Sequence, residues 1–150
     1  MYATKLAHSG QYRVRRILET AMTGPISRTP ADLNELRKMI DPAAGLPLPI
    51  RAQGAGSACT DCNSSETGTT IRMTGLDRII NVDSYNHKVT VQAGVLVADL
   101  VKELAEYGME LIGGYDLAGR TVGGAVSAPC FGPSIGNSGT YFASNVIGLK

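Results

Sequence analysis

The stretch Ile50-Arg-Ala-Gln-Gly-Ala-Gly-Ser-Ala58 is a short apolar segment followed by a loop with almost no side-chain bulk. Small residues let a ligand approach the backbone closely, and glycine permits the positive φ angles that turn successive N–H groups toward one concavity. The hydroxyls of Ser57 and Thr60 are further candidate partners for phosphate oxygens. Considered alone, the loop fits either an anion-binding nest or an ordinary tight turn. Its candidate amide donors are Gly54, Gly56, Ser57 and Ala58.

Length and composition predict one ordinary soluble domain. The chain has 150 residues, of which 43% are apolar and 18% charged, so it is long enough for a core and is not expected to be disordered. A net charge of +1 gives no clustered basic surface, and we expect neither a nucleic-acid partner nor a membrane partner. Without a long apolar run or a secretory signal, the protein is expected to be cytoplasmic.

The three cysteines, Cys59, Cys62 and Cys130, do not predict a metal site. An odd number cannot form a complete disulfide framework, which favours a reducing compartment. The Cys59-x-x-Cys62 pair is similar to a redox dithiol or half of a zinc site. A thioredoxin-type dithiol begins a helix, however, and structural zinc needs two more ligands. Neither histidine has ligand spacing to the pair, so loop or packing cysteines explain it better.

The apolar pattern predicts helices and strands in an irregular order. Two amphipathic helices are expected over 11–22 and 30–40, the second capped by Thr29, with Leu33, Leu36, Met39 and Ile40 as its buried stripe. Another is expected over 96–107, ending before Gly108. Strands are expected over 50–53 and 69–73, in a hairpin of 80–83 with 88–93, and over 146–150. This interleaving lacks regular β-α-β-α spacing, so it favours an α+β fold.

Four segments, taken in order, resemble the FAD-binding (PCMH-type) domain of the vanillyl-alcohol oxidase and p-cresol methylhydroxylase superfamily. They run from about residue 26 to residue 150 and are completed by Gly139-Thr-Tyr141 before Val146-Ile-Gly-Leu149. Each segment is weak by itself, whereas their shared order and spacing are specific. The segments are Pro30-Ala-Asp-Leu-Asn-Glu-Leu36, Ile50-Arg-Ala-Gln-Gly-Ala-Gly-Ser-Ala58, Val89-Thr-Val-Gln-Ala-Gly-Val95 and Thr121-Val-Gly-Gly-Ala-Val-Ser127.

The resemblance implies a small N-terminal parallel sheet with flanking helices, packed on a larger and partly antiparallel sheet that is truncated here, with FAD between them. It implies that Gln53, Gly54, Ala55, Gly56, Ser57 and Ala58 wrap the pyrophosphate. It places Gly114, Asp116, Thr121, Gly123, Gly124 and Ser127 along the flavin and its ribityl chain, although a surface salt bridge with Arg120 is an equal reading of Asp116. Gly139 continues beside the cofactor, and Val146 and Ile147 lie near the adenine.

Two departures from the family qualify these expectations. Many relatives attach the flavin covalently through a histidine in the first loop, and the matching position here is Ser57, so we expect non-covalent FAD. Relatives often carry an acidic residue where Ser144 stands, which puts one contact in doubt. The domain organisation expected is an N-terminal helix and connection over 1–25 and the N-terminal part of the FAD-binding domain over 26–150. We expect the rest of that domain and the substrate domain to be missing from this chain, as in either a fragment of a longer oxidoreductase or a small protein that retains only the flavin-binding half.

Two functional interpretations follow from the resemblance. The first is the FAD-binding segment of an oxidase or dehydrogenase acting on an alcohol, a 2-hydroxy acid or a sugar lactone. That parent enzyme would be flavin-dependent, and this chain alone is not expected to be catalytically complete, so no catalytic residue is nominated. The alternative is a non-catalytic flavin-binding or sensory module. A strand ending at Lys150 would expose a sheet edge, which favours a homo-oligomer.

Overall fold

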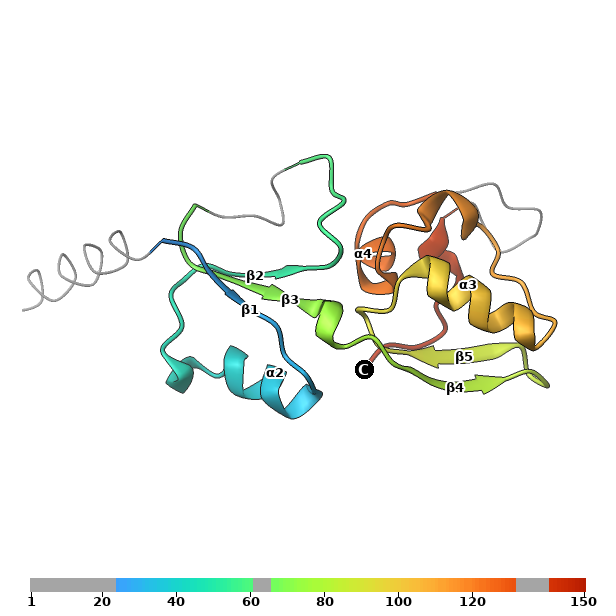
Figure 1. Cartoon of the computed structure of the whole chain (residues 1–150), viewed down its shortest axis with the longest axis horizontal. Coiled ribbons are helices and arrows are strands. Elements are labelled where there is room, and N and C mark those ends of the chain that lie inside the picture. Colours follow the sequence, from blue (N-terminus) through green and yellow to red (C-terminus); the bar gives the residue numbers. More distant parts are fainter. Residues whose placement is uncertain (1–23, 61–65, 132–140) are drawn as a thin grey trace, which may run out of the picture.

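The computed structural model describes residues 24–60, 66–131 and 141–150 (Figure 1). Its elements form two groups that lie side by side (Figure 1). We call residues 26–60 with 66–72 the first lobe, and residues 76–131 with 141–150 the second lobe. A short 3-10 helix, η3 (Met73–Gly75), connects them. The mixture of helices and small sheets confirms the α+β class, while the helix expected over 11–22 lies outside the described residues.

The first lobe is built on a three-stranded parallel sheet of β1 (Ile26–Arg28), β2 (Ile50–Gln53) and β3 (Thr69–Arg72). The strand order is β1-β3-β2, so β3 is central. Thr69 and Ile71 are buried, and the Thr69 hydroxyl donates to the carbonyl oxygen of Pro47 at 2.9 Å. The parallel sheet agrees with the sequence expectation, whereas β1 was not expected because its three residues carry no visible period.

Helix α2 (Leu33–Ile40) begins at a different residue from the one predicted. Asp32, not Thr29, is the N-cap: its Oδ1 accepts from the N–H groups of Asn34 at 2.7 Å and Glu35 at 2.8 Å. The prediction of Thr29 was wrong because a carboxylate next to the first turn satisfies two otherwise unpaired N–H groups. The expected buried stripe was also wrong, since none of its residues is fully buried and Leu33 and Ile40 are 52% and 54% exposed.

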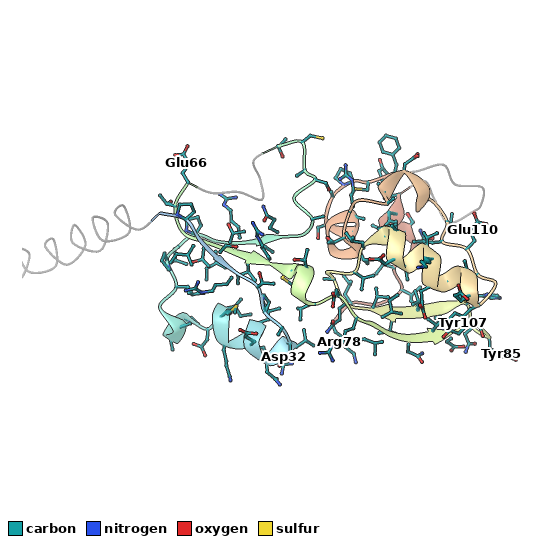
Figure 2. All side chains as sticks on the ribbon, in the orientation of Figure 1. Asp32, Glu66, Arg78, Tyr85, Tyr107 and Glu110 are labelled. Atoms are coloured by element: carbon teal, nitrogen blue, oxygen red, sulfur yellow. The ribbon has the colours of Figure 1, made fainter. Side chains whose placement is uncertain are left out.

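Asp32 gives a pH-dependent prediction. Hydrogen bonds from the first turn of α2, foremost that of Glu35 N–H, hold the pKa of Asp32 below its usual 3.8, and the charges of Lys38 and Arg78 lower it further. A carboxyl whose folded-state pKa is depressed stabilises the fold above its unfolded pKa, and this contribution is lost as the pH falls through the lower folded-state pKa. In Figure 2, Arg78 of the second lobe lies near Asp32.

We therefore expect Asp32→Asn to lower the Tm at pH 7 and to lose less Tm than the wild type on acidification below pH 4. Differential scanning calorimetry from pH 7 to pH 2 measures this. Glu66→Gln, an exposed carboxyl outside any helix (Figure 2), is the control and should follow the wild type. Parallel curves for the wild type and Asp32→Asn would contradict the prediction.

The second lobe contains a hairpin covered by a helix. Strands β4 (Ile79–Asp83) and β5 (Lys88–Val91) are antiparallel, as predicted. Helix α3 (Val97–Glu106) lies beside them, and Gly108 follows it with φ +65°, the conformation expected after a helix end. The core here joins Val95, Leu100 and Leu104 with partly buried residues of the hairpin: Ile79, Val82, Val89 and Val91.

A second core forms where the chain returns over α3. It contains Val97, Leu117, Ala125, Cys130 and Phe142, contributed by α3, η4 (Tyr115–Leu117), α4 (Val122–Ser127), the segment after α4 and η5 (Phe142–Asn145). The strand expected over 146–150 was wrong, because no described strand pairs with these residues and their backbone is irregular. The sheet edge on which the homo-oligomer expectation rested is therefore not formed in the described chain.

Candidate functional site

The loop after β2 is exposed and built from small residues. Residues 55–60 are exposed, and Gly56 has φ +74°, a conformation that other residues rarely adopt. Among the described residues, no acceptor receives a hydrogen bond from the backbone N–H groups of residues 55–58. The Ser57 side chain lies on the same exposed segment. Four consecutive amides and a hydroxyl thus remain for a ligand, which is the donor set expected of an anion nest.

Gly54 fixes this loop against the second lobe. A Cβ at position 54 would collide with the Oγ1 of Thr121 and would lie 3.3 Å and 3.4 Å from its Cβ and Cγ2 atoms. Thr121 is 1% exposed and is the N-cap of α4, accepting from Gly124 N–H at 3.2 Å. Two sequence-predicted segments, the loop at 53–58 and the start of α4, are therefore in contact in the folded chain.

A cleft of about 290 Å³ lies beside this contact. Its lining comes from three places: the loop after β2, the connection from β3 to β4, and the segment leading into α3 together with the first turn of that helix. Sequence reasoning missed most of these residues because they belong to connections and carry no recognisable motif. The signal that could have found them is the position of Gly94 between β5 and α3. The lining residues are Ala55, Thr74, Asp77, Gly94, Leu96 and Asp99.

The first amides of α4 are already engaged inside the protein. Val122 N–H donates to the carbonyl oxygen of Val95 and Gly123 N–H to that of Ala93, both at 2.8 Å. A Cβ on Gly123 would lie 2.9 Å from the Cβ of Ala93, so this glycine lets two backbones meet. The α4 segment thereby holds the 93–95 segment in place. In contrast to these first amides of α4, the amides of the loop at 55–58 have no acceptor among the described residues.

The flavin candidates Gly114 and Asp116 are not among the residues that line the cleft. Gly114 is buried, and a Cβ there would lie 3.1 Å from Leu111 Cδ2 and 3.3 Å from Val101 Cγ2. Asp116 is exposed on η4. Arg120 donates through Nη1 to the Sγ of buried Cys130 at 3.3 Å, and the described residues show no ion pair between Arg120 and Asp116.

The remaining candidates lie toward the C-terminal side. Ser127 is exposed at the end of α4, Val146 is half-buried, and Ile147 is 77% exposed. Gly139 lies outside the described residues. Within the described ranges, no group of three or more His, Cys, Asp or Glu side chains is placed to hold a metal ion. No helix in the part of the chain that the structure describes is long and apolar enough to span a bilayer.

Comparisons with known proteins agree with this geometry. A family model described as an FAD binding domain matches residues 26–150. L-gulono-1,4-lactone dehydrogenase of Mycobacterium tuberculosis is 31% identical over 106 residues, covering 71% of this chain and 24% of that protein. The mitochondrial L-galactono-1,4-lactone dehydrogenase of Arabidopsis thaliana is 27% identical over 103 residues, covering 69% of this chain and 17% of that protein.

A solved structure supports the fold. The crystal structure of 6-hydroxy-D-nicotine oxidase from Arthrobacter nicotinovorans superposes with a TM-score of 0.52 at 20% identity, covering 61% of this chain and 20% of that one. This chain therefore spans about a sixth to a quarter of the length of the lactone dehydrogenases named above and a fifth of that oxidase chain.

Proposed function

Because the chain belongs to the FAD binding domain family, we propose that it is the FAD-binding part of a flavin-dependent oxidoreductase. The observation that carries the proposal is the loop at 55–58, whose N–H groups are without acceptors in the described chain and whose first residue, Ala55, lines the cleft. Such donors suit the two phosphates of a dinucleotide, because an anion in a concavity of backbone amides needs no side-chain charge. The residues present thus fit the cofactor.

In this proposal each candidate has a distinct role. The amides of Ala55, Gly56, Ser57 and Ala58, with the Ser57 hydroxyl, donate to the pyrophosphate. Gln53 ends β2, from which the loop departs, and Gly54 seats that loop on Thr121. Through Val122, Gly123 and Gly124, α4 secures the 93–95 segment and its own first turn. Asp116, Ser127 and Gly139 remain candidates along the flavin, as do Val146 and Ile147 near the adenine and Gly114 in a supporting position.

The names of the relatives favour a sugar lactone as the substrate class. When bound, FAD supplies the acceptor for a hydride, and the chain's own groups bind and orient it. We assign no catalytic residue to the described chain. The relatives support an oxidoreductase over a non-catalytic sensory module. A cytoplasmic location belongs to the proposal and is tested by imaging the tagged protein.

The attachment of the flavin is proposed to be non-covalent, since a histidine is absent from the sequence of the loop at 53–62 and Ser57 offers a hydroxyl instead. We expect the purified chain to take up added FAD with a visible flavin spectrum, and acid precipitation to release the whole flavin into the supernatant. Flavin that stays with the precipitate would contradict non-covalent binding. A colourless protein that fails to take up FAD would contradict the proposed function itself.

A further inference from the structure

The connection between the lobes is held from the second-lobe side by Gly94. The N–H of Gly94 donates to the carbonyl oxygen of Leu76 at 2.8 Å. A Cβ on Gly94 would collide with the carbonyl oxygen of Met73 and would lie 2.7 Å from that of Leu76. Leu76 is 2% exposed, and its N–H donates to Met73 O at 2.9 Å. The backbone of η3 thus lies directly against the backbone at position 94, with no room for a side chain between them.

Gly75 makes a matching approach on the first-lobe side. A Cβ at this position would collide with the carbonyl oxygen of Pro30 and would lie 2.9 Å from Thr29 Cγ2. Pro30 is fully buried, so the backbone at Thr29-Pro30 has little space to withdraw. Since η3 is in close contact with one backbone segment from each lobe, Gly75 within it and Gly94 against it determine how closely the lobes approach (Figure 1).

The strand register of the first-lobe sheet places η3 next to the loop at 54–58. Gln53 at the end of β2 pairs with Arg72 at the end of β3. The next residue after Gln53 is Gly54, which begins the loop, and the next after Arg72 is Met73, which begins η3. A displacement of η3 therefore moves Arg72, whose partner Gln53 directly precedes the loop that contacts Thr121. Thr74 and Gly94 also line the cleft, so the same displacement changes its width.

We propose that Gly75 and Gly94 are positioning residues for the FAD site: by seating η3 between the lobes, they fix the spacing between the loop at 54–58 and the start of α4. The inference rests on the proposed function for the identity of the ligand. The spacing itself is a property of the ligand-free protein, so that part of the inference does not depend on the proposed function. The two can therefore fail separately.

The test measures the spacing first and the affinity second. Spin labels carried on unnatural amino acids replace the exposed residues Lys38 on α2 and Lys102 on α3. Double electron–electron resonance on the ligand-free protein then reports the distance between the lobes. We expect Gly94→Ala and Gly75→Ala to shift or broaden this distance distribution. We also expect each to raise the Kd for FAD by about tenfold or more, measured by flavin fluorescence.

Gly119→Ala is the matched control, because a Cβ there has no atom within 4 Å and the backbone has no positive φ. It should keep the wild-type distance and Kd. Leu104→Ala, a core change inside the second lobe, should lower stability without moving the distance, which separates positioning from general destabilisation. An unchanged distance in both folded glycine variants would overturn the inference. A wild-type chain that does not bind FAD would overturn the proposed function instead.

If both alanine variants fail to fold, hydrogen exchange of the wild type decides. Leu76 is buried directly after η3, its N–H closes that helix by donating to Met73 O, and it does not line the cleft. Under the inference, saturating FAD slows its exchange by about threefold or more, since a ligand between the lobes resists local opening of the connection. Unchanged exchange at Leu76, with FAD bound, would overturn the inference.

Discussion

In the Gly54→Ala variant, the Kd for FAD rises by about tenfold or more. The added methyl group occupies the space of the Thr121 hydroxyl, and Thr121 is too buried to turn away. We expect the loop at 55–58 then to move away from α4, so that, under the proposed function, its amides no longer bind the pyrophosphate together. Titration of the chain with FAD, followed by quenching of flavin fluorescence, measures the change, while circular dichroism confirms that the variant is folded.

A double-mutant cycle with Thr121→Ala tests this cause directly. Thr121→Ala removes the atom that the new methyl group would meet, at the cost of the N-cap of α4, about 1 kcal/mol. Gly54→Ala should therefore cost less affinity in the Thr121→Ala background than in the wild type. Gly119→Ala again serves as the unconstrained glycine control. Equal losses in the two backgrounds would show that the contact with Thr121 is not the reason.

Replacing Leu104 with alanine has the largest expected effect on stability. Leu104 is 2% exposed between α3 and the hairpin, in the core that also holds Val95 and Leu100. Deleting a buried leucine side chain lowers the free energy of unfolding by about 2–5 kcal/mol, because transfer energy is lost and a cavity remains. Domains are stable by only about 5–15 kcal/mol, so urea unfolding should show a markedly lower midpoint.

Lys102→Ala on the same helix is the matched control. Lys102 is exposed, and surface replacements away from caps and networks change stability by about 0.5 kcal/mol or less. Since alanine favours helix, the control also removes any effect of propensity. A loss for Leu104→Ala no larger than that of Lys102→Ala would mean that α3 is not seated on the hairpin as described.

Sequence reasoning succeeded where local pattern and final structure agree. The hairpin of β4 and β5 alternates with period two, and α3 places Val97, Leu100 and Leu104 on one face, so each could be predicted from its own residues. β1 could not be predicted in this way. It has three residues, and what makes it a strand is its pairing with β3, more than forty positions later.

In α4 and the site, too, some features could be predicted from local sequence and others depend on tertiary contacts. Two adjacent glycines disfavour a helix locally, yet α4 forms because the carbonyl groups of Ala93 and Val95 accept its first amides, a tertiary effect that propensity does not contain. The loop at 54–58 could be nominated from its small side chains, and Thr121 from the family resemblance of its segment. Thr74, Asp77 and Asp99 could not, since only the folded chain brings these polar residues of unrelated segments to one cleft.

The central position of β3 also bears on how the chain is made. In the order β1-β3-β2, neither early strand is the neighbour of the other, so both wait for a strand that ends at Arg72. A chain in which β3 has not yet paired therefore presents β1 and β2 as two unpaired strands. Parallel pairing is non-local and slow to form. Until β3 is in place, the unpaired edges of β1 and β2 are therefore open to pairing with other chains.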